Sequence, residues 1–147
     1  LALMNKPAGR EYDKFVRKIE SLNRGREKKC YLANYFISAH PGATLADALR
    51  LAQYLIQRGM HPEQVQDFIP LPMTLSGCMY HTGVHPFTGE KVYAAKTFKE
   101  RKMQRALIQY RNPGNKAFIE QALRELRAGA IKHLLSRRCG SFAQGRR

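Results

Sequence analysis

The first part of the chain shows a helical pattern of apolar residues followed by a strand-like one. Between residues 9 and 24, apolar side chains recur at spacings of three and four with charged residues between them, which predicts an amphipathic helix. Its apolar positions are Tyr12, Phe15, Val16, Ile19 and Leu22. Residues 30–37, CYLANYFI, form a short run rich in apolar and aromatic side chains. This run predicts a buried strand.

The segment after this strand predicts a helix and then a second strand. Pro41 and Gly42 mark a turn, and Thr44 with Asp47 three residues later forms a capping box at the start of a helix. Residues 64–69 then predict another strand. A strand, a helix and a strand in close succession predict a parallel βαβ unit. Because two strands cannot bury both faces of a parallel sheet, we expect the sheet to continue outside this sequence.

The second half of the chain is turn-rich at first and then helical. Residues 74–96 contain many turn-forming residues. Thr97 with Glu100 predicts a second capping box, which opens a helix reaching to about residue 110. Apolar periodicity between residues 118 and 135, with a break near Gly129, predicts a further helix. The last residues lack periodicity, so we expect a loose tail.

The net charge of +15 is concentrated in the second half. Residues 1–70 carry a net charge of +4, whereas residues 71–147 carry +11. Such a surface attracts polyanions, so RNA or an acidic protein is a candidate partner of the basic half. The alternative interpretation is a solvated, partly disordered tail.

Aromatic residues lie among these basic residues, a mixture that can stack on and neutralise RNA. The aromatic positions are Tyr80, Tyr93, Phe98 and Tyr110, and the basic ones run from Lys91 to Arg111. The alternative is that the helix near residues 98–110 packs through its apolar side chains and turns its lysines and arginines to solvent. Its packed face would then hold Phe98, Met103, Leu107 and Tyr110.

Cysteine usage and hydropathy limit the cellular compartments in which we expect the protein. Cys30, Cys78 and Cys139 are odd in number and far apart, which argues against a disulfide scaffold and favours a reducing compartment. No stretch of the sequence has the length and hydropathy of a membrane helix. The chain also lacks a phosphate-binding P-loop and any recognisable hydrolase order of residues. We therefore expect a cytoplasmic protein without a membrane partner.

The loops that follow the two predicted strands are candidate ligand sites, because ligands of parallel sheets bind beyond the carboxyl ends of the strands. Ser38, His40 and Gly42 lie in the first loop, and Thr74 follows the second strand. Gly42 allows close approach of the backbone, and the capped helix offers free N–H groups. His40 could contact a substrate or transfer a proton near neutral pH. The alternative is that these residues only turn the chain and bond the local backbone.

A second candidate site is a zinc site formed by Cys78, His81 and His85. Zinc accepts Cys and His ligands at such spacings. Three ligands close in sequence are fewer than a structural zinc site needs. The alternative interpretation is a structural or substrate-facing loop.

Five motifs follow one another along the chain. They are LMNKP from Leu3, YFISAHPG from Tyr35, QVQDFIPLPMT from Gln64, CMYHTGVHPFTGEKVY from Cys78 and QRALIQYRNPGN from Gln104. Similar runs occur in the same order in the YgiQ-type family of radical S-adenosylmethionine (SAM) proteins, an uncharacterised family. The chain resembles the C-terminal portion of such a protein, including its C-terminal domain of unknown function. The resemblance covers residues 1 to about 126.

The resemblance implies an α/β fold class with a partial barrel. Residues 1–73 would form the C-terminal strand–helix units of a radical SAM-type β/α barrel. Residues 74–135 would form a basic, mostly helical extension, and residues 136–147 a disordered tail. The upstream part of the same barrel would be the partner of this chain.

The resemblance also implies a use for the strand ends. In radical SAM enzymes, the side chain at the Ile37 position packs on the adenine of SAM. The backbone of the last strand, here Phe68, Ile69 and Pro70, lies against the same ring. The loops that hold Ser38, His40, Gly42 and Thr74 would face an unknown substrate.

Three positions depart from the family pattern. Ala39 stands where many relatives have Gly, and Ala43 where many have Glu. Met73 replaces the Gly of a P-x-P-G-T motif. The departures lie in the two loops that follow the predicted strands.

Radical SAM enzymes hold a four-iron four-sulfur cluster with three closely spaced cysteines, commonly C-x-x-x-C-x-x-C. The cysteines of this chain lack that spacing, so we expect the cluster ligands upstream and no SAM cleavage by this chain alone. The leading hypothesis is a C-terminal fragment of a radical SAM enzyme of unknown substrate. The alternative is a non-catalytic basic module that binds RNA or an acidic partner.

Overall fold

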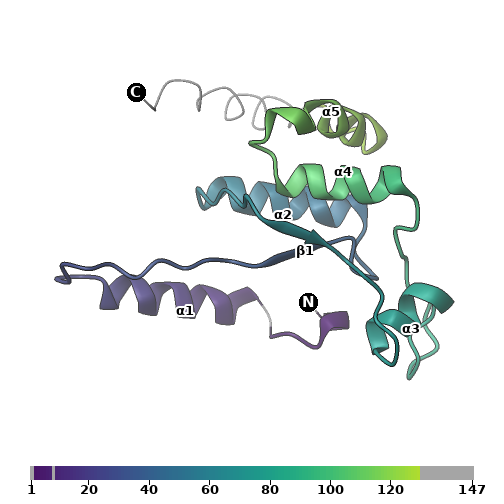
Figure 1. Ribbon diagram of the computed structural model, residues 1–147, viewed down its shortest axis with the longest axis horizontal. Coiled ribbons are helices and arrows are strands. Elements are labelled where there is room, and N and C mark those ends of the chain that lie inside the picture. Colours follow the sequence, from purple (N-terminus) through teal and green to yellow (C-terminus); the bar gives the residue numbers. More distant parts are fainter. Residues whose placement is uncertain (1, 8, 130–147) are drawn as a thin grey trace. The chain divides into compact units, whose positions relative to one another are not determined.

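A computed structural model of the chain describes residues 2–7 and 9–129, which belong to two compact units (Figure 1). The first unit, Leu1–Asn34, contains η1 (Ala2–Met4) and α1 (Gly9–Leu22). The second unit begins at Tyr35. It contains β1 (Phe36–Ser38), α2 (Leu45–Gln57), β2 (Val65–Asp67), α3 (Leu75–Thr82), α4 (Phe98–Ile108), η2 (Pro113–Asn115) and α5 (Lys116–Glu125).

The first unit confirms the predicted amphipathic helix, which ends two residues earlier than expected. None of the residues of α1 is buried, and its apolar side chains Phe15 and Leu22 are exposed. The side chain of Asn23 bonds both backbone polar groups of Cys30, which folds the chain back after the helix. The residues of this unit that the structure describes therefore form local structure without a buried core.

The second unit confirms the predicted parallel βαβ unit and the α/β class. Strands β1 and β2 pair in parallel, with Ile37 opposite Gln66 in the register. Helix α2 connects them and begins with the predicted capping box of Thr44 and Asp47. Both strands have three residues and are shorter than predicted. In the described part of the chain each pairs only with the other, and the barrel remains a prediction.

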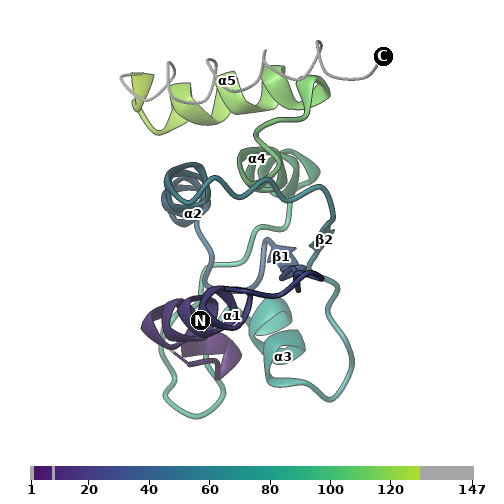
Figure 2. The same ribbon diagram turned by 90° about the vertical axis from the view of Figure 1, so that its left-hand side faces the viewer.

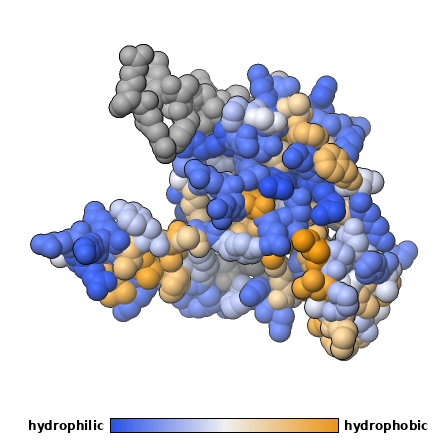
Figure 3. Space-filling model, in the orientation of Figure 1, coloured by the Kyte–Doolittle hydropathy of each residue, from blue (hydrophilic) through white to orange (hydrophobic). Residues whose placement is uncertain are grey.

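The core of the second unit lies between the sheet and three helices. Helices α2 and α4 cover one face of the strand pair, and α5 packs on α4 (Figure 2). Leu55 of α2 and Leu107 of α4 are fully buried, and Phe36 and Val65 of the strands pack into the same cluster. The surface over α2 and α4 is mainly hydrophilic on the face drawn in Figure 3, as expected for amphipathic helices. The predicted barrel part and the predicted extension thus share one core.

Residues 74–96 differ from the expected turn-rich loop. Residues Leu75–Thr82 form helix α3, which Thr74 caps and Gly83 ends in a left-handed conformation. An isolated antiparallel bridge joins Val84 and Lys91. Helix α3 was missed because its sequence has little helical periodicity.

Helix α4 confirms the second capping box, formed by Thr97 and Glu100. Met103 and Tyr110 are buried as expected for its packed face, but Phe98 is 76% exposed, so including it in that face was wrong. Phe98 lies at the first helical position, outside the contact of the helix with the core.

Helix α5 ends earlier than predicted. The chain leaves the helix after Glu125, and Arg127 adopts a left-handed backbone conformation, so the turn precedes Gly129. The predicted helical positions beyond residue 129 and the predicted disordered tail lie outside the described residues, as does Cys139. Among the helices that the structure describes, none is both long and apolar enough to cross a membrane.

Candidate functional site

The carboxyl ends of β1 and β2 lie side by side, as expected for a parallel pair. The Ser38 hydroxyl donates a hydrogen bond to Asp67 Oδ1 at 2.6 Å. The backbone N–H of Phe68 donates to the Ser38 carbonyl at 2.8 Å. The two loops predicted to carry the site therefore begin next to one another at the same edge of the sheet. Helix α3 lies beyond the strand ends (Figure 1).

His40 links the first loop to α3. Its Nδ1 lies 2.9 Å from the Pro41 carbonyl oxygen, and its Nε2 lies 2.8 Å from Ser76 Oγ. Because a carbonyl oxygen only accepts hydrogen bonds, Nδ1 carries the proton. In the neutral ring Nε2 then accepts from the Ser76 hydroxyl. The ring also stands edge-on to Phe68, with 5.0 Å between ring centroids.

Burial lowers the pKa of His40 below its ordinary value, although the bond to the Pro41 carbonyl acts in the opposite direction. The imidazole is therefore neutral at neutral pH. Both ring nitrogens have partners within the chain, and the residue is buried. These contacts favour the interpretation of His40 as a structural residue of the loop.

The Pro41-Gly42 turn is fastened to neighbouring backbone. The N–H of Gly42 donates to the Tyr93 carbonyl at 2.6 Å, and the N–H of Ala43 donates to the His40 carbonyl at 2.9 Å. Gly42 has a φ of 86°, a conformation that glycine adopts without strain. Both N–H groups already donate hydrogen bonds within the chain, so they are not available to bind an anion.

The predicted cofactor residues divide into exposed and buried side chains. Ile37 is 36% exposed and Ile69 is 58% exposed. Phe68 is buried between the rings of His40 and Tyr80, with centroid distances of 5.0 Å and 5.8 Å. Apolar side chains are therefore accessible at Ile37 of β1 and at Ile69 after β2, while Phe68 itself packs inside the unit.

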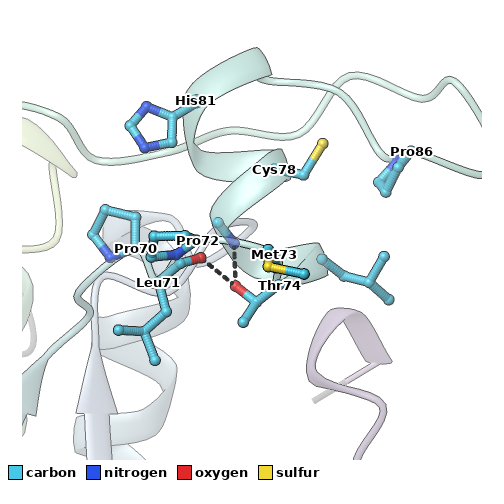
Figure 4. A pocket seen from close by; sticks show the side chains of 10 residues that line it. Pro70, Leu71, Pro72, Met73, Thr74, Cys78, His81 and Pro86 are labelled. Carbon is cyan, nitrogen blue, oxygen red and sulfur yellow. Dashed lines mark hydrogen bonds between the residues drawn. The ribbon is translucent and has the colours of Figure 1, made fainter.

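An open groove of about 610 Å³ lies beside the second loop (Figure 4). It is lined by residues 70–75 together with Gly77, Cys78, His81 and Pro86. The Thr74 hydroxyl donates to the Leu71 carbonyl at 2.8 Å and accepts from the Gly77 N–H at 3.0 Å. The predicted site residue Thr74 thus caps α3 and lies at the wall of an apolar groove.

The residues of the candidate zinc site do not come together. Cys78 and His81 point away from one another in Figure 4. His85 Nδ1 accepts hydrogen bonds from the backbone N–H groups of Phe87 and Thr88. Within residues 2–7 and 9–129, no group of three or more His, Cys, Asp or Glu side chains could hold a metal ion.

The basic residues of α4 make contacts within the second unit. Lys99 pairs with Glu125 at 2.9 Å, and the Lys102 ammonium lies 5.9 Å from the ring centroid of Phe118. Arg101 and Arg105 contact the ends of the strands. These contacts favour the interpretation of α4 as a packed helix over that of a free basic surface.

Sequence reasoning missed Ser76 and Gln104 as residues of this region. Ser76 meets His40 across 36 positions of the chain, a pairing that no local pattern indicates. Gln104 is a polar residue on a buried helix face, at a spacing of three from Leu107. A polar side chain on an apolar stripe could have indicated a buried hydrogen bond.

Comparison with known proteins gives several similar sequences. A domain of unknown function (DUF3362) matches residues 63–132. A UPF0313 protein of Methanocella arvoryzae is 52% identical over 120 residues, which cover 82% of this chain and 20% of that protein. For a UPF0313 protein of Methanosarcina acetivorans the identity is 50%, with coverages of 82% and 16%. One of Clostridium botulinum is 47% identical over 123 residues, with coverages of 84% and 19%.

No solved structure matches the chain. The chain spans about a fifth of the length of these curated relatives. This agrees with the predicted C-terminal portion of a longer protein that includes a domain of unknown function. The chain therefore belongs to the UPF0313 family, as a portion of one of its members.

Proposed function

We propose that this chain supplies the C-terminal edge of a radical SAM barrel, where Ile37, Ile69 and Pro70 face the adenine of SAM. The observation that carries the proposal is the parallel pair of β1 and β2. Helices cover one face of this pair, whereas Ile37 on the opposite face stays exposed. The motif resemblance to the YgiQ-type radical SAM family supplies the identity of the cofactor.

The accessible residues suit an adenine ring. Apolar side chains that cover the faces of a flat aromatic ring remove these faces from water, which stabilises the bound ring. Ile37 and Ile69 offer such side chains at the strand ends, and Pro70 adds a rigid ring without an N–H group. The buried Phe68 could contribute its backbone but not its side chain. When bound, SAM would supply radical chemistry that no side chain of this chain provides.

The described residues do not fit a four-iron four-sulfur cluster. Such a cluster needs several thiolates at one point. Cys30 and Cys78 are both free thiols, and they lie in different units of the chain. We therefore assign no step to a cluster here and place its ligands in the remainder of the longer protein.

The substrate would approach from the side of the groove. Thr74 is exposed at the groove, whereas Ser38 and His40 are buried and bonded within the chain. In this proposal Thr74 faces the unknown substrate. Ser38 and His40 do not contact it and instead stabilise the loop around Gly42 through their hydrogen bonds within the chain.

The substitution Ile37→Asp in the full-length protein tests the proposal. A carboxylate against the adenine would lose its hydration without a partner, so we expect SAM binding to weaken roughly tenfold or more. Phe87→Asp is the matched control, because it introduces the same charge in place of an apolar side chain. The Phe87 side chain is 78% exposed and lies outside the groove. Binding is measured by calorimetry and SAM cleavage by 5′-deoxyadenosine formation. Equal values for both variants and the wild type would count against the proposal.

A basic module that binds RNA or an acidic partner is the second candidate function, favoured by the net charge of +11 on residues 71–147. Lys99 and Arg105 pair with carboxylates within the unit, which reduces the charge available to a partner. Salt-dependent binding of the chain to generic RNA would support this function. Absence of binding at low salt would remove it.

A further inference from the structure

One face of α4 contacts the ends of both strands. Arg101, Gln104 and Arg105 have the spacing i, i+3 and i+4, which places them on the same side of a helix. Each of the three reaches a different group at the carboxyl ends of β1 and β2 or in the loop that follows β1. We call these three residues the α4 brace.

Gln104 holds the loop after β1. Its side-chain Nε2 donates to the Ala43 carbonyl at 2.8 Å, directly after the Pro41-Gly42 turn. Gln104 is only 1% exposed. Loss of this acceptor would leave the buried amide without a hydrogen bond and destabilise the fold. The bond therefore holds the turn against α4.

Arg105 holds the two strand ends through Asp67. Its guanidinium lies 3.4 Å from Asp67 Oδ2, while Oδ1 of the same carboxylate accepts the hydrogen bond from Ser38. The Nε of Arg105 donates to Gln109 Oε1 at 3.1 Å, which orients the guanidinium. One carboxylate thus connects β1, β2 and α4.

Arg101 reaches the backbone beside the exposed isoleucine of the second strand. Its guanidinium donates to the Phe68 carbonyl at 3.3 Å, immediately before Ile69. The three contacts are therefore made from one side, by α4, to residues at or directly after the strand ends that carry Ile37 and Ile69.

We propose that the α4 brace positions the strand ends and the Pro41-Gly42 turn for ligand binding. Helix α4 lies within residues 63–132, which match the domain of unknown function, whereas Ser38 and Ala43 precede that match. The domain of unknown function would thus stabilise a ligand site that is built partly from the preceding segment. The ligand in this proposal rests on the proposed SAM function, but the positioning of the loop does not.

Hydrogen exchange on the full chain tests the positioning. Gln104→Met keeps the shape of the side chain and removes the donor to Ala43. We expect amides in residues 38–44 to exchange roughly tenfold faster in this variant. Gln121→Met, the same substitution on α5, is the control and should leave residues 38–44 unchanged. Unchanged exchange in the Gln104→Met variant would overturn the proposal.

SAM binding by the full-length protein tests the consequence for the ligand. Arg105→Met should weaken binding roughly tenfold, because small displacements of a site are costly. Arg105→Lys keeps a cation beside Asp67 and should restore binding to within roughly threefold of the wild type. If Arg105→Met does not fold, Gln104→Met replaces it in the same measurement.

The outcomes separate the two proposals. Wild-type protein that does not bind SAM would refute the proposed function, and hydrogen exchange would still decide the positioning. Wild-type protein that binds SAM, together with unweakened binding by the folded brace variants, would refute the positioning alone. Weakened binding by Arg105→Met that Arg105→Lys restores would support both.

Discussion

Met73 and Ala39 hold backbone conformations that glycine prefers. Their φ angles are 60° and 57°, in the left-handed region. Many of the radical SAM motifs that the chain resembles have Gly at these two positions, so a residue with a Cβ there implies local backbone strain. A residue with a Cβ in this region costs roughly 1–2 kcal/mol. Both departures therefore place a strained residue in a loop that follows a strand.

Replacing Met73 with Gly should stabilise the chain. The Met73 side chain is fully exposed, so little packing is lost, and the left-handed conformation becomes free of strain. We expect the free energy of unfolding to rise by about 1 kcal/mol, measured by urea denaturation. Phe87→Gly is the control, because Phe87 is exposed but has no positive φ. A loss of stability in Met73→Gly as large as that in the control would contradict this account.

At the scale of elements, the capping boxes were the most predictable features. Thr44 with Asp47 and Thr97 with Glu100 open α2 and α4 where the sequence placed them. The reason is that a capping box depends on residues only three positions apart. In the second box, the hydrogen bond from Thr97 lowers the pKa of Glu100.

Removal of the second cap should destabilise the second unit. Thr97→Ala leaves the Glu100 N–H without its side-chain acceptor, and we expect the free energy of unfolding to fall by about 1 kcal/mol. The lowered pKa of Glu100 means that the contribution of the box is present above the unfolded-state value and is lost as pH falls through the folded-state value. Thr88→Ala, in an exposed loop, is the control in the same urea titration. Equal stability of the two variants at pH 7 would contradict this role of Thr97.

Helix α3 and the length of β1 show where prediction from local sequence failed. Gly77 lowers the helix propensity of α3, yet a Cβ at this position would lie 2.3 Å from the Leu71 carbonyl oxygen. The glycine is there for close packing, and that requirement cannot be read from neighbouring residues. Residues 30–37 predicted a full strand, but only Phe36 and Ile37 of this run belong to β1, because a strand extends only as far as it has a partner.

The candidate site was predictable in place but not in detail. The parallel βαβ pattern correctly placed the ends of both strands at one sheet edge. The contacts that fix this edge, between His40 and Ser76 and between Gln104 and Ala43, join segments far apart in the sequence. Side-chain burial at Phe68 likewise depends on Tyr80, which comes from a helix that the pattern did not predict.

At the scale of the whole molecule, the chain is one portion of a longer protein. It spans about a fifth of its curated relatives and forms two compact units. The second unit buries its core between α2, α4, α5 and one face of the sheet, so the strand ends have a defined shape within this portion. The proposed cofactor edge therefore depends on residues both before and within the domain of unknown function.

Photoaffinity labelling of the full-length protein tests the central claim most directly. An azidoadenine analogue of SAM would be cross-linked to the purified protein, and the labelled peptides identified by mass spectrometry. We predict labelling of peptides that contain Ile37 or Ile69, with unlabelled SAM competing for the label. SAM-sensitive labelling confined to peptides outside this chain would contradict the claim that these strand ends face the adenine.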